Sequence, residues 1–86
     1  MRFRFSRHAE REMMRRAIPK DLVESLLRNP QQRVREAGCK WIYQSQVEFG
    51  RGTMYLVRAV VAEDEDPPVV VTVYRTSRIE KYWRPE

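Results

Sequence analysis

The sequence predicts an α+β domain in which two N-terminal helices pack on a twisted antiparallel sheet of about four strands. Apolar residues recur at helical spacing as far as Pro30, and from Gln32 onward they alternate as in strands. Gly and Pro residues separate the strand segments. The expected order is β-α-α-β-β-β-β, and 86 residues leave room for one domain, residues 1–86.

The first segments predict a strand over Arg2–Phe5 and a helix over Arg7–Arg16 with Ser6 as its N-cap. At 100° per residue, one third of this helix gathers four side chains: His8, Arg11, Glu12 and Arg15. The opposite side, through which we expect the helix to pack, carries Ala9, Met13, Met14 and Ala17.

The second helix is expected to have Pro19 in its first turn and to end at Asn29-Pro30. Its apolar stripe consists of Leu22, Val23, Leu26 and Leu27. Four strands are then expected, over Arg33–Glu36, Lys40–Phe49, Thr53–Ala62 and Val69–Tyr74. Gly50-Arg51-Gly52 predicts a hairpin turn, and the acidic run from Glu63 to Pro68 predicts a loop. In the strand over Lys40–Phe49 we expect Gln44, Gln46 and Glu48 on the polar face. An arm or short helix, Arg75–Trp83, completes the pattern.

The charge distribution indicates an acidic partner. The net charge is +5, and fourteen of the seventeen basic residues are arginine, whose planar fork matches phosphate oxygens in pairs. Nucleic acid or an acidic protein would fit such a surface. A lone Cys39 predicts no disulfide, and neither a signal peptide nor a membrane span is recognised. We therefore expect a cytoplasmic protein without a membrane partner, for which a homodimer is one way to stabilise so small a core.

Two residues stand out as chemical candidates. His8, the single histidine, can move a proton near neutral pH, or it can hold the start of its helix through a backbone hydrogen bond. Arg58 lies between Val57 and Ala59 in the most apolar strand, so its charge must reach an acidic partner, a sheet edge or a ligand.

The C-terminal run from Val71 to Arg84 interleaves rings, hydroxyls and cations, which suits RNA contact. Alternatively, Tyr82 and Trp83 cap the core while the charges are solvated. The sequence has no metal-ligand spacing, no Gly-rich phosphate loop and no serine-nucleophile motif, so we expect no metal and no cofactor.

The stretches SRHAEREMMRRAIPKDLVESLLRNP and VVTVYRTSRIEKYW resemble a bacterial family called domain of unknown function 4258. Ala17 replaces the usual glycine of that pattern, and Glu12 stands where arginine is frequent. The element order also resembles RelE-like toxins. That resemblance implies a metal-free ribonuclease paired with a separate antitoxin protein, although a fold does not confer a function.

The leading hypothesis is thus a metal-independent ribonuclease of the toxin–antitoxin type that acts on RNA or ribosome-bound RNA. His8 would transfer a proton, with Arg16, Arg58 and Arg75 stabilising the phosphate and Tyr82 acting as acid or stacking platform. Further RNA contacts are assigned to Arg11, Arg15, Ser77 and Lys81. The alternatives are a non-catalytic module that binds RNA or an acidic protein, and a structural subunit that forms a stable oligomer.

Overall fold

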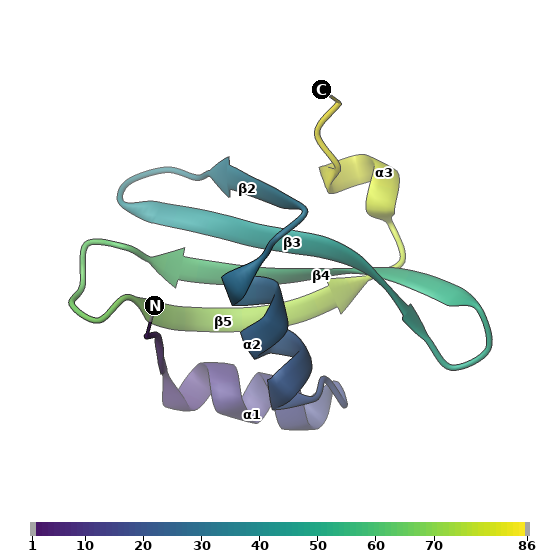
Figure 1. Cartoon of the computed structure of the whole chain (residues 1–86), viewed down its shortest axis with the longest axis horizontal. Helices are drawn as coiled ribbons and strands as arrows, with labels where there is room; N and C mark the ends of the chain where they lie inside the picture. Colours follow the sequence, from purple (N-terminus) through teal and green to yellow (C-terminus); the bar gives the residue numbers. More distant parts are fainter. Residues whose placement is uncertain (1, 86) are drawn as a thin grey trace.

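The computed structural model describes residues 2–85, which form one mixed five-stranded sheet and three helices (Figure 1). The elements are β1 (Arg4–Phe5), α1 (Arg7–Arg15), α2 (Lys20–Arg28), β2 (Gln32–Arg35), β3 (Lys40–Phe49), β4 (Thr53–Ala62), β5 (Val69–Thr76) and α3 (Ile79–Tyr82). The sheet order is β1-β5-β4-β3-β2. The predicted α+β class and two N-terminal helices are confirmed. The expectation of a purely antiparallel sheet is wrong, because β1 pairs with β5 in parallel.

Helix α1 begins as the sequence predicts. The Ser6 hydroxyl accepts a hydrogen bond from the Ala9 amide at 3.0 Å and donates one to the Val71 carbonyl at 2.8 Å. This side chain therefore caps the helix and also ties it to β5. Ala9 and Met13 are buried against the sheet, as expected.

The end of α1 differs from the prediction. The Ile18 amide donates to the Met13 carbonyl and the Ala17 amide to the Met14 carbonyl, which is the Schellman pattern that closes a helix. Ala17 has a φ of 54° and is exposed, and the Met14 side chain is 84% exposed. The expectation that Met14 and Ala17 pack inward is wrong, because Met14 projects away from the sheet and the helix has already ended at Ala17.

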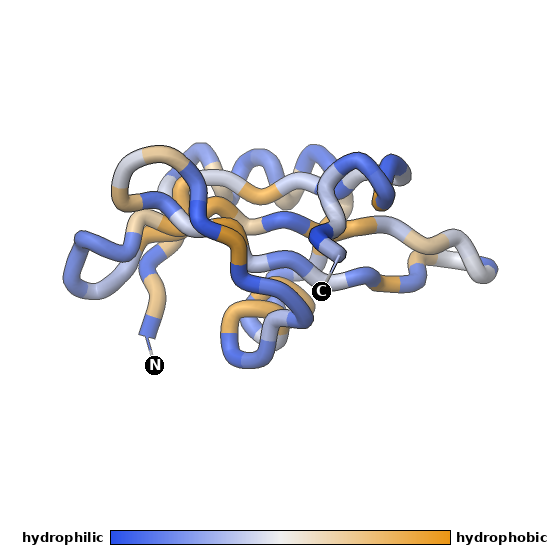
Figure 2. Tube along the Cα trace, turned by 90° about the horizontal axis from the view of Figure 1, so that it is seen from above, coloured by the Kyte–Doolittle hydropathy of each residue, from blue (hydrophilic) through white to orange (hydrophobic). Residues whose placement is uncertain are grey.

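Helix α2 buries three of the four residues of its predicted apolar stripe, Val23, Leu26 and Leu27, while Leu22 is half-buried. Both N-terminal helices pack on the same face of the sheet, which we call the helix face. Its buried hydrophobic residues in the sheet are Tyr43, Val57, Ala59, Val61, Val70 and Val73. In Figure 2 hydrophobic residues lie along the strands in the middle of the molecule, and the loop at the left is hydrophilic.

The long hairpin of β3 and β4 forms the centre of the sheet, with Phe49 paired to Thr53 next to the predicted turn. Consecutive strand residues point to opposite faces, so Ile42, Leu56 and Arg58 lie on the face away from α1 and α2. We call this the α3 face, because the short helix α3 and the segment after it fold back over it. Figure 1 shows α3 near the upper edge of the sheet and α1 below β5.

Four smaller differences concern element bounds. The first strand is shorter than expected, β2 lies one residue earlier, and β5 continues to Thr76. Arg75 is consequently a strand residue and does not belong to the C-terminal arm. Pro19 is the N-cap of α2 and precedes its first turn.

Candidate nucleic-acid interface

A row of four polar side chains crosses the α3 face from one strand to the next. The strand register pairs Gln32 with Gln44, Gln44 with Arg58, and Arg58 with Tyr74. The row therefore runs across β2, β3, β4 and β5, perpendicular to the strands. Neighbouring strands are about 4.8 Å apart, a spacing at which paired side chains on one face can touch.

Hydrogen bonds connect this row without a break. The Gln44 amide nitrogen donates to the Gln32 amide oxygen at 2.7 Å, and Arg58 Nε donates to the Gln44 amide oxygen at 2.8 Å. Arg58 Nη1 donates to the Tyr74 hydroxyl at 2.6 Å. Gln44 is fully buried and thereby fixes the plane of the guanidinium.

Arg58 is a buried cation without an acidic partner. Its residue exposure is 7%, and no carboxylate among residues 2–85 forms an ion pair with it. Two of its N–H groups have protein acceptors; the others have none among these residues. These contacts are an amide oxygen and a hydroxyl, neither of which carries a negative charge, and an anion would supply that charge. The sequence left three ways to compensate the charge of Arg58: an acidic partner, a sheet edge or a ligand. The structure shows no acidic partner within residues 2–85.

The C-terminal segment closes over Arg58. The guanidinium carbon lies 4.2 Å from the centre of the Tyr82 ring, in cation–π geometry. The Tyr82 carbonyl accepts from Gln44 at 3.3 Å. Gln32 donates to the Arg84 carbonyl at 2.6 Å and accepts from the Arg84 amide at 3.1 Å. We call Gln32, Gln44, Arg58, Tyr74 and Tyr82 the Arg58 site.

A basic groove continues from one end of the row. It has a volume of about 620 Å³, and its lining includes Gln32, Arg35 and Arg84. Both of these arginines are exposed. The groove begins at Gln32, two strands away from Arg58, and its exposed guanidinium groups are suited to phosphate contacts.

The predicted candidates on α1 lie elsewhere, because α1 packs on the helix face and Arg58 points to the α3 face. The His8, Arg11 and Arg15 side chains are exposed. No side-chain hydrogen bond of His8 is found within residues 2–85, and Ser6 caps the helix in its place. Arg15 and Arg16 both bind Glu12 with N–O distances of 3.0 Å, which lowers the pKa of Glu12 to about 2.

The remaining candidates are divided between the two faces. Lys81 is exposed beside the Arg58 site, with its ammonium 5.4 Å from the Tyr82 ring centre. Arg75 points to the helix face, where its guanidinium carbon lies 4.4 Å from the Phe49 ring centre and 4.8 Å from that of Tyr55. Ser77 is exposed between β5 and α3. The structure therefore groups Arg58, Tyr82 and Lys81, and it separates them from His8 and Arg75.

A second polar cluster, partly exposed, lies on the helix face at the start of the acidic loop. Arg33 stacks 3.7 Å from the Trp41 ring centre and binds Glu63, which also accepts from the Tyr43 hydroxyl. Burial opposes ionisation of Glu63, but the hydrogen bonds from Arg33 and Tyr43 outweigh it and lower its pKa. Burial, and then the bond to Glu63, raises the pKa of Tyr43. Because its charges are mutually satisfied, this cluster stabilises the fold and offers no free cation.

Sequence reasoning missed Gln32, Gln44 and Tyr74. Gln44 lies on the face opposite Tyr43, as expected, but the sequence did not indicate that α3 and the following segment bury it. The predicted turn at Arg51 contained the information needed to find Gln44. A hairpin folded there places Phe49 opposite Thr53 and, five pairs further on, Gln44 opposite Arg58.

Within the described part of the chain, no group of His, Cys, Asp and Glu side chains could hold a metal ion. No helix there is long and apolar enough to cross a membrane. Cys39 is exposed and unbridged.

The fold and the Arg58 site define a small basic α+β protein with a buried arginine on its sheet that forms no ion pair within residues 2–85. The chain belongs to the family described as Domain of unknown function (DUF4258), whose model matches residues 5–75. No curated protein and no solved structure matches the chain, so the resemblance to RelE-like toxins has no support from these comparisons.

Proposed function

We propose that the protein binds RNA and that Arg58 contacts a backbone phosphate. The observation that carries this proposal is the buried guanidinium with free N–H groups and no carboxylate partner among residues 2–85. A phosphate supplies the missing negative charge and accepts two N–H bonds in one plane. The groove lined by Arg35 and Arg84 supplies further phosphate contacts, and the Tyr82 and Trp83 rings suit stacking by unpaired bases.

A salt titration of RNA affinity tests this proposal. Fluorescence anisotropy with a labelled single-stranded RNA would compare wild type with Arg58→Gln. Loss of one charged hydrogen-bonding contact should weaken binding by about ten- to a hundredfold. The slope of log affinity against log salt should also fall by about one.

The matched control is Arg51→Gln, which removes the same charge from the exposed hairpin turn. We expect the affinity of this variant to stay within about twofold of wild type. If Arg58→Gln behaves like Arg51→Gln, the phosphate contact is not at Arg58 and the proposal fails.

Metal-independent RNA cleavage, as in a toxin–antitoxin pair, is the second candidate function. The Tyr74 hydroxyl favours it, because this proton donor is 2.6 Å from Arg58 and therefore beside the proposed phosphate. When a ribose 2′-hydroxyl attacks its own 3′-phosphate, the departing 5′-oxygen needs a proton, which Tyr74 could supply. On this proposal the protein acts in the cytoplasm and has a separate antitoxin partner.

Cleavage assays in EDTA would compare two single variants at matched RNA occupancy. Tyr74→Phe should lower a wild-type cleavage rate by about a hundredfold or more while binding is retained. His8→Ala tests the sequence-based assignment, in which proton transfer takes place on α1. A rate lost only in His8→Ala would assign the chemistry to α1, and no cleavage by wild type would leave RNA binding as the function.

A further inference from the structure

Helix α1 presents an apolar side chain in a basic surface. Met14 is 84% exposed, whereas Met54, the other exposed large hydrophobic residue within residues 2–85, is 41% exposed. Steps of four and three residues place Arg7, Arg11 and Met14 in one row along the helix. Arg15 is adjacent to this row. We call Arg7, Arg11, Met14 and Arg15 the α1 strip.

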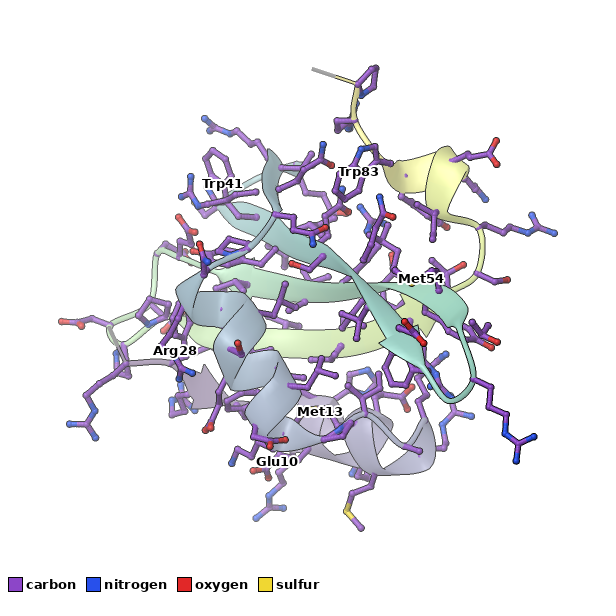
Figure 3. All side chains as sticks on the ribbon, turned by 45° about the vertical axis from the view of Figure 1, so that its right-hand side comes forward. Glu10, Met13, Arg28, Trp41, Met54 and Trp83 are labelled. Atoms are coloured by element: carbon purple, nitrogen blue, oxygen red, sulfur yellow. The ribbon has the colours of Figure 1, made fainter. Side chains whose placement is uncertain are left out.

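A groove lies next to Met14, where α1 turns into α2. Its volume is about 530 Å³, and it is lined by Glu10, Met13, Met14, Ile18, Pro19 and Lys20. Four of these six residues are apolar. Figure 3 shows Glu10 and Met13 at the α1 end of the molecule and Trp83 beside α3, so the groove is remote from the Arg58 site. A concave apolar site with a protruding methionine is suited to holding one side chain of a partner.

The chain segment that contains this groove carries excess positive charge. Residues 7–20 contain five cations and two carboxylates. Glu12 is occupied by Arg15 and Arg16, and Glu10 lies 3.5 Å from Lys20. Arg7 and Arg11 form no ion pair within residues 2–85, and both are exposed. The surface around Met14 therefore complements a negatively charged partner.

We propose that the α1 strip and its groove bind an acidic amphipathic helix of another protein. An apolar side chain of that helix enters the groove beside Met14, and its carboxylates contact Arg7 and Arg11. RNA would use the arginines but would leave the apolar floor of Met13 and Ile18 unexplained. A second copy of this chain would bring the same cations against each other. This surface and the Arg58 site face opposite ways, so the inference does not depend on the proposed RNA function.

A designed peptide provides the probe. It has about 18 residues, with leucines at every third or fourth position forming one stripe and glutamates on the other face. Isothermal titration would give its affinity for wild type and for Met14→Ser. We expect Met14→Ser to weaken binding by about tenfold, and Arg11→Glu to weaken it by at least as much.

The controls are Met54→Ser in β4 (Figure 3) and Arg51→Glu in the hairpin turn, which make the same changes at exposed positions. Their affinities should remain within about twofold of wild type. A peptide of the same composition without the leucine stripe should bind more weakly. Amide shifts induced by the striped peptide should fall on α1 and the start of α2.

Four results would overturn this inference. Two concern the peptide alone: no binding of the striped peptide, or equal effects of Met14→Ser and Met54→Ser on its affinity. The other two are displacement of the peptide by single-stranded RNA and dimerisation of the free chain that Met14→Ser abolishes. The last two would assign the surface to RNA and to a second copy, respectively. Because Met14 and Arg11 are exposed, their substitution leaves the core unchanged.

Discussion

The Tyr82 ring covers the guanidinium of Arg58, with 4.2 Å between the ring centre and the guanidinium carbon. Tyr82 belongs to a four-residue helix without a single buried residue. The position of the C-terminal segment therefore depends largely on this stacking and on the hydrogen bonds from Gln32 and Gln44. A polar row on the sheet thus holds in place the segment that covers it.

Two substitutions of Tyr82 distinguish the contribution of its ring from that of its hydroxyl. Tyr82→Leu removes the ring face and should lower the free energy of unfolding by about 1 kcal/mol, as for a partly buried cation–π contact. Tyr82→Phe keeps the ring, and within residues 2–85 the hydroxyl donates to no partner, so stability and RNA affinity should match wild type. Urea denaturation measures the stability of each variant, and fluorescence anisotropy measures its RNA affinity. Loss of a cleavage activity in Tyr82→Phe would instead assign the hydroxyl the role of general acid.

Gln44 is the residue whose loss should most disturb the site. Gln44→Leu removes the acceptor of Arg58 Nε and the donors to Gln32 and Tyr82. Buried partners left unsatisfied in this way cost about 1–3 kcal/mol each, so we expect the variant to be destabilised by several kcal/mol. Gln46→Leu, on the same strand but only half-buried, is the control. Similar urea midpoints for the two variants would contradict the importance of the row.

Ala17 is strained at the end of α1. Its φ of 54° is left-handed, a region that costs a residue with a Cβ about 1–2 kcal/mol and that glycine adopts freely. After allowance for the greater freedom of unfolded glycine, Ala17→Gly should stabilise the fold by about 0.5–1 kcal/mol. Ala37→Gly has no positive φ to relieve and should not stabilise the fold. Thermal and urea unfolding of both variants provide the comparison.

The two ion pairs of Glu12 predict that the stability of the folded state depends on pH. Hydrogen bonds from Arg15 and then Arg16 lower the pKa of Glu12 from 4.5 to about 2. A carboxylate whose pKa falls on folding stabilises the folded state fully above its unfolded value, and this stabilisation is lost as the pH falls from about 4.5 toward 2. Glu12→Gln should therefore have a lower urea midpoint than wild type near neutral pH, and the difference should shrink across that range.

Glu24→Gln is the control for this measurement, because Glu24 is exposed on α2 and forms no ion pair within residues 2–85. Its difference from wild type should stay small throughout. A Glu12→Gln difference that is constant with pH would show that the ion pairs do not contribute to stability.

Much of the fold could be predicted because its signals are local. The Ser6 cap, the apolar stripe of α2 and the Gly50-Arg51-Gly52 turn each depend on residues close together in the chain. The pairing of β1 with β5 depends on segments far apart in sequence, and a two-residue strand carries no periodicity that could indicate its partner. Met14 was misplaced because it lies about 140° around the helix from the buried Ala9, at the margin of the stripe rather than on its packed side.

The candidate site could be predicted only in part. Arg58 was identifiable because a charge in an apolar strand requires compensation. Its neighbours required strand register, and Tyr82 required knowledge that the chain folds back over the sheet. Composition drew attention to His8 and the arginines of α1, but composition does not say on which side of a sheet a helix packs.

The parallel pairing of β1 with β5 also has a consequence for synthesis of the chain. The Ser6 hydroxyl binds the Val71 carbonyl, 65 positions later, and the Arg4 amide binds the Pro68 carbonyl. These contacts cannot form until most of the chain has left the ribosome, and closing so long a loop is entropically costly. Strand β1 and the N-terminal anchor of α1 can therefore become ordered only after β5 has been synthesised.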